Sequence, residues 1–224
     1  TGDNNTFVGY TAGDAVSTAN NVTAVGANAL SANTSAANNV AVGHDALKLN
    51  TTGTGNVAVG TYVLDANTDS TGNTGVGYQV LTANTDGDNS TGVGYQALAA
   101  NTTGSQVTGI GYHAGTLNTT GSNSTFLGYR AGCAVTTGAQ NTILGMHAAL
   151  LLTTGGDNTL VGCGAGENIA TSSANNVAVG RLALQAAGTR SNNTAIGMSA
   201  LSANTTGDLN TAVGKDSLNT STTG

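Results

Sequence analysis

Glycine preceded by Val, Ile or Leu recurs along the whole chain at a nearly constant interval. The interval is 17 residues at eleven steps and 18 residues at one. Near these glycines, apolar positions alternate over short stretches such as Val40-Ala41-Val42, a pattern typical of β-strands. The repeat therefore predicts short strands joined by tight turns. The recurring glycines, each taken as position 0 of its repeat, are Gly9, Gly26, Gly43, Gly60, Gly77, Gly94, Gly111, Gly128, Gly145, Gly162, Gly180, Gly197 and Gly214.

This repeat predicts an all-β fold, a parallel β-solenoid with one 17-residue repeat in each of thirteen coils. The unit is too short for a helical repeat and is rich in Gly, Thr and Asn, which are poor helix formers. One copy has too few apolar atoms to bury a core, so the copies must stack as parallel strands. We expect residues 1–224 to form a single β-solenoid domain, a rod on the order of 60 Å long. Because the chain starts at Thr1 without Met, we also expect it to be a fragment of a longer fibrous protein.

Residues at positions −2, +4 and +7 vary together between the copies. A small residue at −2 accompanies Leu at +4, as in Ala24 and Leu30, whereas the large Phe126 accompanies Gly132. The coils with a large −2 residue also replace the usual Asn at +7 by an apolar residue, such as Val135. Packed interiors tolerate neither voids nor surplus methylenes, so these three positions are predicted to line one shared space.

Positions −3, −1 and +3 form a second, more uniform row. Because −1 and −2 point to opposite strand faces, one row should fill the coil interior, and the other is available to face another chain. In the seventh coil Gly109 and Gly115 are both small, and Leu117 is expected to fill the gap. The extra residue of the 18-residue step is expected in a turn within residues 171–174.

Composition and charge exclude several classes of function. Charged residues make up 7% of the chain, with three His and two Cys. No Ser, His and Asp set recurs at a spacing suited to nucleophilic catalysis, and the glycines open no helix as a phosphate loop does. We therefore expect no enzyme and no cofactor. Five Lys and Arg against a net charge of −6 argue against nucleic acid, and no apolar run approaches the roughly 18 residues of a membrane helix.

Tyrosine occupies position +1 in four consecutive coils, and polar side chains follow it at +2. In register this forms an aromatic stripe with hydrogen-bonding neighbours, suited to a host-surface glycan or protein. The alternative is a ladder that stabilises only the stacking between coils or between chains. The tyrosines are Tyr78, Tyr95, Tyr112 and Tyr129, and their neighbours are Gln79, Gln96, His113 and Arg130.

Asp69 and Asp86 share position +9 in adjacent coils, with Asp88 close by. Stacked carboxylates ~5 Å apart repel one another, and Ca²⁺ would relieve the repulsion. Turns that splay apart in water are the simpler explanation, so we expect no metal, and these three residues are the candidates if one binds.

Two further residue types carry chemistry. Cys133 and Cys163 lie two coils apart, ~9.6 Å along the axis, so they are expected to be free thiols, compatible with assembly in a reducing cytoplasm. His113 and His147 are also two coils apart with Arg130 between them, which is poor metal geometry, and are expected at the surface. Threonine columns at +8 and +9 suggest an ice-binding face, whereas the more ordinary use of both Thr and Asn columns is as hydrogen-bond ladders and turn caps.

Two resemblances bear on the fold and the function. Residues 39–43 (Asn-Val-Ala-Val-Gly) and 193–197 (Asn-Thr-Ala-Ile-Gly) resemble the Asn-x-Val-x-Ile-Gly units of trimeric autotransporter adhesin heads. That resemblance implies a left-handed β-roll, association in threes, and Val and Ile facing the coil interior. Residues 94–104 and 125–132 are similar to repeats of phage-type tail-fibre proteins, which often end in an endosialidase-type intramolecular chaperone domain.

Together these observations predict a structural protein. We expect a homotrimeric shaft or receptor-presenting segment of a phage tail fibre or a similar extracellular appendage, located outside the cell or on a virion, that supports host attachment. A cell-surface trimeric adhesin head and an ice-binding β-solenoid are the alternatives.

Overall fold

The computed structural model confirms the all-β parallel β-solenoid, with thirteen strands and a repeat of about 17 residues. It describes residues 2–186 and 188–222. The chain divides into two compact units, unit 1 from Thr1–Gln106 and unit 2 from Val107–Gly224. In the described ranges, no helix has the length and hydrophobicity needed to traverse a membrane.

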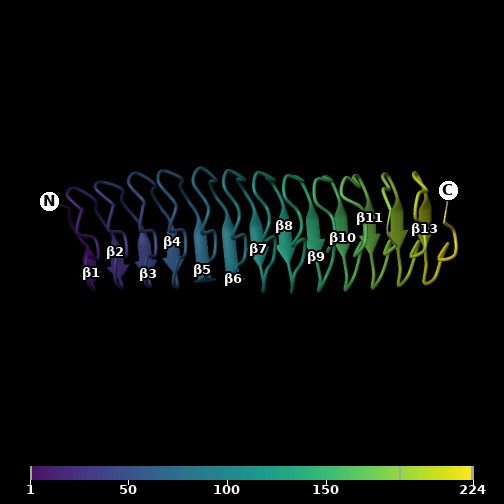
Figure 1. The fold of residues 1–224 in the computed structure, drawn as a ribbon, viewed down its shortest axis with the longest axis horizontal. Helices are drawn as coiled ribbons and strands as arrows, with labels where there is room; N and C mark the ends of the chain where they lie inside the picture. Colours follow the sequence, from purple (N-terminus) through teal and green to yellow (C-terminus); the bar gives the residue numbers. More distant parts are fainter. Residues whose placement is uncertain (1, 187, 223–224) are drawn as a thin grey trace. The chain divides into compact units, whose positions relative to one another are not determined.

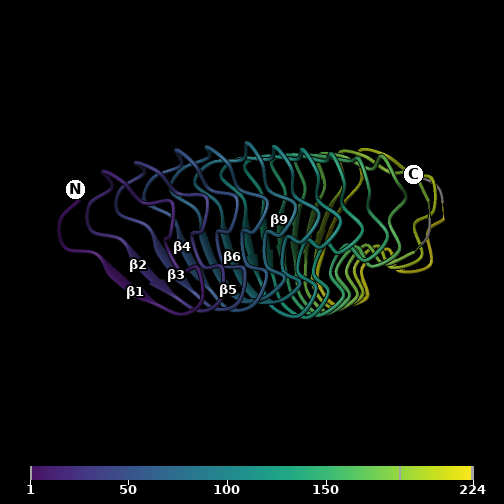
Figure 2. The same ribbon diagram turned by 60° about the vertical axis from the view of Figure 1, so that its left-hand side comes forward.

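Unit 1 holds six strands that stack in chain order (Figure 1). Each strand is parallel to the next and in register, so that Val25 pairs with Val42 and Val42 with Val59. The turned view in Figure 2 shows the strands of this unit on one wall, with irregular segments completing each coil. The strands are β1 (Thr6–Val8), β2 (Thr23–Val25), β3 (Val40–Val42), β4 (Val57–Val59), β5 (Thr74–Tyr78) and β6 (Thr91–Tyr95).

Unit 2 holds seven strands in the same parallel arrangement. Val161 pairs with Val179, so the register of the strands survives the 18-residue step. The extra residue lies in a turn at Thr171 and Ser172, which the Ser173 N–H closes by donating to Ala170 O at 3.1 Å, and this confirms the expected place. The strands are β7 (Thr108–Ile110), β8 (Thr125–Leu127), β9 (Thr142–Leu144), β10 (Thr159–Val161), β11 (Val177–Val179), β12 (Thr194–Ile196) and β13 (Thr211–Val213).

Hydrogen bonds between neighbouring coils continue outside the strands. In unit 1 the Asn28 N–H donates back to Tyr10 O at 2.9 Å, and the Leu30 N–H donates forward to Ala46 O at 3.0 Å. Both residues have positive φ, 58° at Asn28 and 51° at Leu30, a conformation that residues other than glycine rarely adopt. Repeated left-handed residues at +2 and +4 thus turn the chain while its backbone stays bonded on both sides.

The repeat glycine at position 0 is required by the close approach of neighbouring coils. Gly26 has a φ of 134°, and a Cβ added to it would lie 2.4 Å from the carbonyl oxygen of Gly43. Any side chain would therefore collide with the next coil as well as strain the backbone. This explains why the glycine recurs in every copy.

The size exchange between −2, +4 and +7 is confirmed as an interior packing rule. Ala24, Leu30 and the +7 residue Asn33 are all fully buried in unit 1. In unit 2 the ring of Phe126 is fully buried, and a Cβ added to Gly132 would lie 2.4 Å from it. The glycine therefore supplies the room that the phenylalanine occupies.

Three expectations about the interior are wrong. The +3 residues belong inside, since Ala29 and Ala97 are fully buried, and only −3 and −1 face outward. Strand parity does not extend to +3, because the left-handed residue at +2 comes between. The adhesin-type placement of Val is also reversed: the middle residue Ala41 is fully buried, while its neighbours in β3 are partly exposed.

The interior of the seventh coil also differs from the expectation. Leu117 is 50% exposed and so does not fill the gap beside Gly109 and Gly115. The strand register instead pairs Gly109 with Phe126, the bulkiest apolar side chain of the interior. The volume is balanced between adjacent coils here, not within one coil.

Two columns of buried asparagine satisfy the polar backbone of the interior. At position −4, Asn39 Oδ1 accepts the backbone N–H of Asn56 at 2.9 Å, and its Nδ2 donates to Gly53 O at 2.8 Å. At position +7, Asn67 Nδ2 donates to Asn50 Oδ1 at 2.7 Å. The predicted use of asparagine columns as hydrogen-bond ladders is confirmed, and these ladders run along the coil interior.

Candidate functional site

The aromatic stripe of unit 1 lies where β5 and β6 end. The rings of Tyr78 and Tyr95 stack with centroids 5.4 Å apart and planes 15° from parallel. Beside them, Gln96 Nε2 donates to Gln79 Oε1 at 2.7 Å. The structure therefore brings these four predicted residues together, and the glutamines bond to one another.

Two residues outside the predicted stripe extend it. Tyr62 packs edge-on against Tyr78 at 6.3 Å, and His44 packs edge-on against Tyr62 at 5.4 Å. Tyr62 lies at position +2 instead of +1, so a search for tyrosine at one repeat position misses it. Aromatic character at either +1 or +2 was the signal that could have found both.

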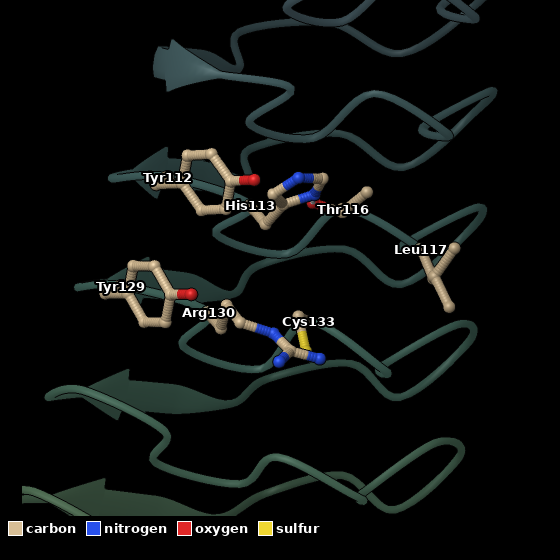
Figure 3. A pocket seen from close by; sticks show the side chains of 7 residues that line it. All are labelled: Tyr112, His113, Thr116, Leu117, Tyr129, Arg130 and Cys133. Carbon is tan, nitrogen blue, oxygen red and sulfur yellow. Dashed lines mark hydrogen bonds between the residues drawn. The ribbon is translucent and has the colours of Figure 1, made fainter.

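In unit 2 the stripe borders a hollow of about 400 Å³. Tyr112 and Tyr129 form one side of it, with ring centroids 5.3 Å apart and planes 9° from parallel. Figure 3 shows both hydroxyl groups directed to the side where His113 and Arg130 lie. The lining residues are Tyr112, His113, Thr116, Leu117, Tyr129, Arg130 and Cys133.

The polar side of the hollow carries a single positive charge. His113 Nδ1 lies 3.2 Å from Thr116 Oγ1, and the imidazole packs edge-on against Tyr112 at 4.3 Å. Burial, helped by the positive charge of Arg130, lowers the pKa of His113 below its usual range. The imidazole is therefore neutral at neutral pH, and Arg130 is the one cation among lining residues that include no carboxylate.

Three of the lining residues were not predicted as part of a site. The sequence predicts no role for Thr116, a free thiol for Cys133 and an interior position for Leu117. They lie at +5 and +6, on the turn that follows the +2 residue, and they line the same hollow as the tyrosines. Positions +5 and +6, which follow the stripe residues along the same coil, were the signal that could have indicated these lining residues.

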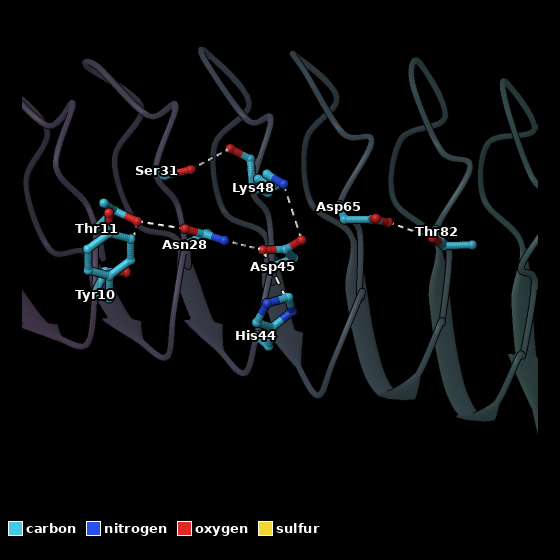
Figure 4. A network of polar contacts seen from close by, with 9 residues as sticks. All are labelled: Tyr10, Thr11, Asn28, Ser31, His44, Asp45, Lys48, Asp65 and Thr82. Carbon is cyan, nitrogen blue, oxygen red and sulfur yellow. Dashed lines mark hydrogen bonds and ion pairs between the residues drawn. The ribbon is translucent and has the colours of Figure 1, made fainter.

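A second polar cluster lies in unit 1, along the +2 column (Figure 4). Asp45 accepts from Asn28 Nδ2 at 2.7 Å and from Lys48 Nζ at 3.2 Å, and Asn28 Oδ1 accepts from Thr11 Oγ1 at 2.7 Å. Burial would raise the pKa of Asp45, but these hydrogen bonds and the Lys48 charge outweigh it and hold the pKa below its usual range. The cluster thus stabilises stacking between coils with a carboxylate that stays ionised.

The candidate metal residues each bond to protein groups. Asp69 and Asp86 accept hydrogen bonds from the preceding threonine of their own coil, at 3.3 Å and 2.8 Å. Asp88 instead caps the neighbouring coil, accepting the backbone N–H of Thr71 at 2.7 Å. Among the described residues no cluster of three or more His, Cys, Asp or Glu side chains is suited to hold a metal.

The two cysteines and His147 take separate places in unit 2. Cys133 and Cys163 are free thiols of intermediate exposure. His147 lies beside Tyr129, and its Nδ1 is 3.9 Å from a carboxylate oxygen of Glu167. Its side chain is 31% exposed, so the surface placement expected for His147 is only partly right.

The +8 threonines serve as hydrogen-bond ladders. Thr51 Oγ1 donates to Thr68 O at 3.1 Å in unit 1, and Thr119 Oγ1 donates to Thr136 O at 3.1 Å in unit 2. These hydroxyls are engaged by the next coil, which confirms the ordinary use predicted for this column. An ice-binding face would need hydroxyls directed to water.

No protein-family model, no curated protein and no solved structure matches the chain. The likeness to tail-fibre and adhesin repeats therefore rests on the motifs of the sequence.

Proposed function

We propose that the chain is a structural fibre segment, a shaft or receptor-presenting part of a phage tail fibre or similar extracellular appendage that supports host attachment. The observation that carries this proposal is the ladder within each unit. Strand backbone, corner threonine and interior asparagine all form hydrogen bonds to the next coil. Continuous bonding along one direction resists extension and bending, which is what a shaft must do.

The outward face of the strands supports self-association as a homotrimer. In unit 2 the −1 residues Leu127, Val179 and Ile196 are 36–44% exposed and stack in register with their neighbours. Monomeric proteins rarely leave a contiguous apolar row open to water. Two further copies of the chain, as the adhesin resemblance implies, would cover it.

Sedimentation equilibrium of the chain tests this proposal. We expect a mass about three times 21.7 kDa. Replacing Val179 and Ile196 together by Lys should lower the measured mass toward that of a monomer, because lysines buried in the interface between copies would lack partners. Leu151→Lys is the control, since Leu151 is also an exposed apolar residue (51%) but lies at +6, off the strands. A wild-type chain that stays monomeric over the whole concentration range would overturn the trimer.

The same surfaces would suit a cell-surface trimeric adhesin head. The full-length gene distinguishes the two, because a tail fibre is expected to continue into a chaperone domain and an adhesin into a membrane anchor. A thermal hysteresis measurement tests the ice-binding alternative, which the engaged +8 hydroxyls make less suitable.

A further inference from the structure

We propose that the hollow beside Tyr112 and Tyr129 binds a carboxylate-bearing sugar, with the tyrosine rings under the sugar and Arg130 on its carboxylate. This inference rests on the proposed role in host attachment and names the ligand class of that role.

The two tyrosines supply a flat apolar ledge. The planes of the two rings are 9° from parallel, and the two residues are 46% and 47% exposed. A ledge of two parallel rings matches the C–H face of a pyranose, and the two hydroxyl groups lie at its edge, on the side of His113 and Arg130 (Figure 3). An occupant with an apolar face and a polar rim is therefore favoured.

Arg130 supplies the charge that the occupant must match. Its side chain is exposed and forms no ion pair with any residue of the described ranges. A guanidinium offers a planar fork of donors that fits a carboxylate with two parallel hydrogen bonds. Because the chain is acidic overall, with a net charge of −6, an uncompensated arginine beside an aromatic ledge is a local exception that selects an anionic group.

Unit 1 contains a natural comparison for this site. There the stacked pair Tyr78 and Tyr95 is flanked by Gln79 and Gln96, which bond to one another and carry no charge. Position +6, which is Leu117 in the seventh coil, is Ala100 in the sixth coil, so the larger apolar side chain that lines the hollow has no counterpart there. Each unit has a stacked tyrosine pair, whereas the arginine charge and the leucine belong to unit 2.

Titration with matched sugars tests the proposal. Methyl glucuronide and methyl galacturonide are compared with methyl glucoside and methyl galactoside, using protein-observed NMR on the intact chain. At least one acid should bind saturably in the millimolar range, at least about tenfold more tightly than its neutral counterpart, and shift the resonances of residues 112–133. Equal binding of acid and neutral sugar, or binding of none of the four, would overturn the inference.

Variants separate the roles of charge and ledge. Arg130→Gln copies the unit 1 residue and should abolish the preference for the acid, whereas Arg130→Lys should retain part of it. Tyr112→Ala should weaken the binding of the acid and of the neutral sugar alike. Arg181→Gln removes the same charge from another exposed position of unit 2 and should change nothing. Unchanged preference in Arg130→Gln, with the fold intact by circular dichroism, would reject Arg130 as the carboxylate ligand.

The outcome is separable from the test of the fibre role. A trimeric chain that binds none of the sugars retains the fibre proposal and loses the ligand. A monomeric chain that binds the acid through Arg130 retains the ligand and loses the trimer.

Discussion

Single residues set the distance between neighbouring coils. Gly145 in unit 2 has a φ of 133°, and an added Cβ would lie 2.4 Å from the carbonyl oxygen of Gly162. Gly145→Ala should therefore separate two coils as well as strain the backbone, and we expect a loss of more than about 3 kcal/mol in the free energy of unfolding by urea.

Gly55→Ala is the matched control for this prediction. Gly55 also has positive φ, 69°, but an added Cβ would meet nothing within 4 Å. Only the conformational cost of about 1 kcal/mol remains, and Asn38 tolerates the equivalent position one coil earlier. Equal losses for the two variants would show that the close contact at the repeat glycine does not matter.

Arg190 is a second residue whose effect can be isolated. Its side chain is fully buried, Nη2 donates to the carbonyl oxygens of Leu184 and Ala186, and Nε and Nη1 have no partner among the described residues. Burial lowers the pKa of Arg190 to about 10. A charged group held this way destabilises the folded state, so Arg190→Met should raise the free energy of unfolding at pH 7 by about 2 kcal/mol.

The effect of Arg190 should depend on pH. Above about pH 10 the folded chain binds fewer protons at Arg190 than the unfolded chain does, so wild-type stability gains from this group as pH rises. The advantage of Arg190→Met should shrink there, in urea titrations compared at pH 7, 9 and 11. Arg181→Met, at an exposed position, should show no such trend. A constant advantage would mean that Arg190 is not a buried cation.

At the scale of the repeat element, buried asparagines connect one coil to the next. Asn73 Oδ1 accepts the N–H of Ser90 at 2.9 Å, and Asn73 Nδ2 donates to Gly87 O at 2.8 Å. Asn73→Ala would leave the buried N–H of Ser90 without this acceptor, whereas Gly87 O keeps the hydrogen bond from Asn84 Nδ2 at 3.0 Å. We expect a cost of about 1–3 kcal/mol in urea unfolding, the usual cost of one unpaired buried group.

Serine provides the milder variant at this position. The eighth coil carries Ser124 there, and its Oγ accepts the backbone N–H of Asn141 in the next coil at 3.1 Å. Asn73→Ser should therefore cost less than Asn73→Ala because a hydroxyl can retain one of the two bonds. A serine variant no more stable than the alanine variant would contradict the ladder as the source of the effect.

The elements also show what the sequence could and could not predict. The 17-residue interval located the strands, and the exchange of Phe126 with Gly132 identified interior positions, because both follow from packing constraints that repeat in every copy. The burial of Ala29 could not be predicted by strand parity, since Asn28 adopts positive φ and resets the direction of the side chains.

The candidate site was predicted only in part, for a related reason. Tyr112 and Arg130 were found because they recur at fixed repeat positions next to a strand. Leu117 and Cys133 reach the hollow from a turn, where no periodic rule relates sequence position to side-chain direction. Unique residues on irregular segments give no repeat signal, and unit 2 differs from unit 1 through such residues.

For the whole molecule, the low charge content predicts stability that hardly responds to salt. Charged residues are 7% of the chain, and the ion pairs among the described residues include exposed contacts such as Lys215 with Asp216 at 3.7 Å. Exposed pairs contribute about 0–1 kcal/mol each, and salt screens them. The bonds between coils are mostly neutral amide and hydroxyl contacts, which screening does not weaken.

We therefore expect the melting temperature to change by less than about 4 °C between roughly 0.05 and 0.5 M NaCl, measured by circular dichroism. The Asp45 cluster is the place where salt should act first, because it joins Lys48, His44 and a carboxylate. Asp45→Asn keeps an acceptor for Asn28 but removes the charge, so it should lose the residual salt dependence. A strong salt dependence that survives in Asp45→Asn would show that long-range charge, and not the neutral ladder, controls the stability of the chain.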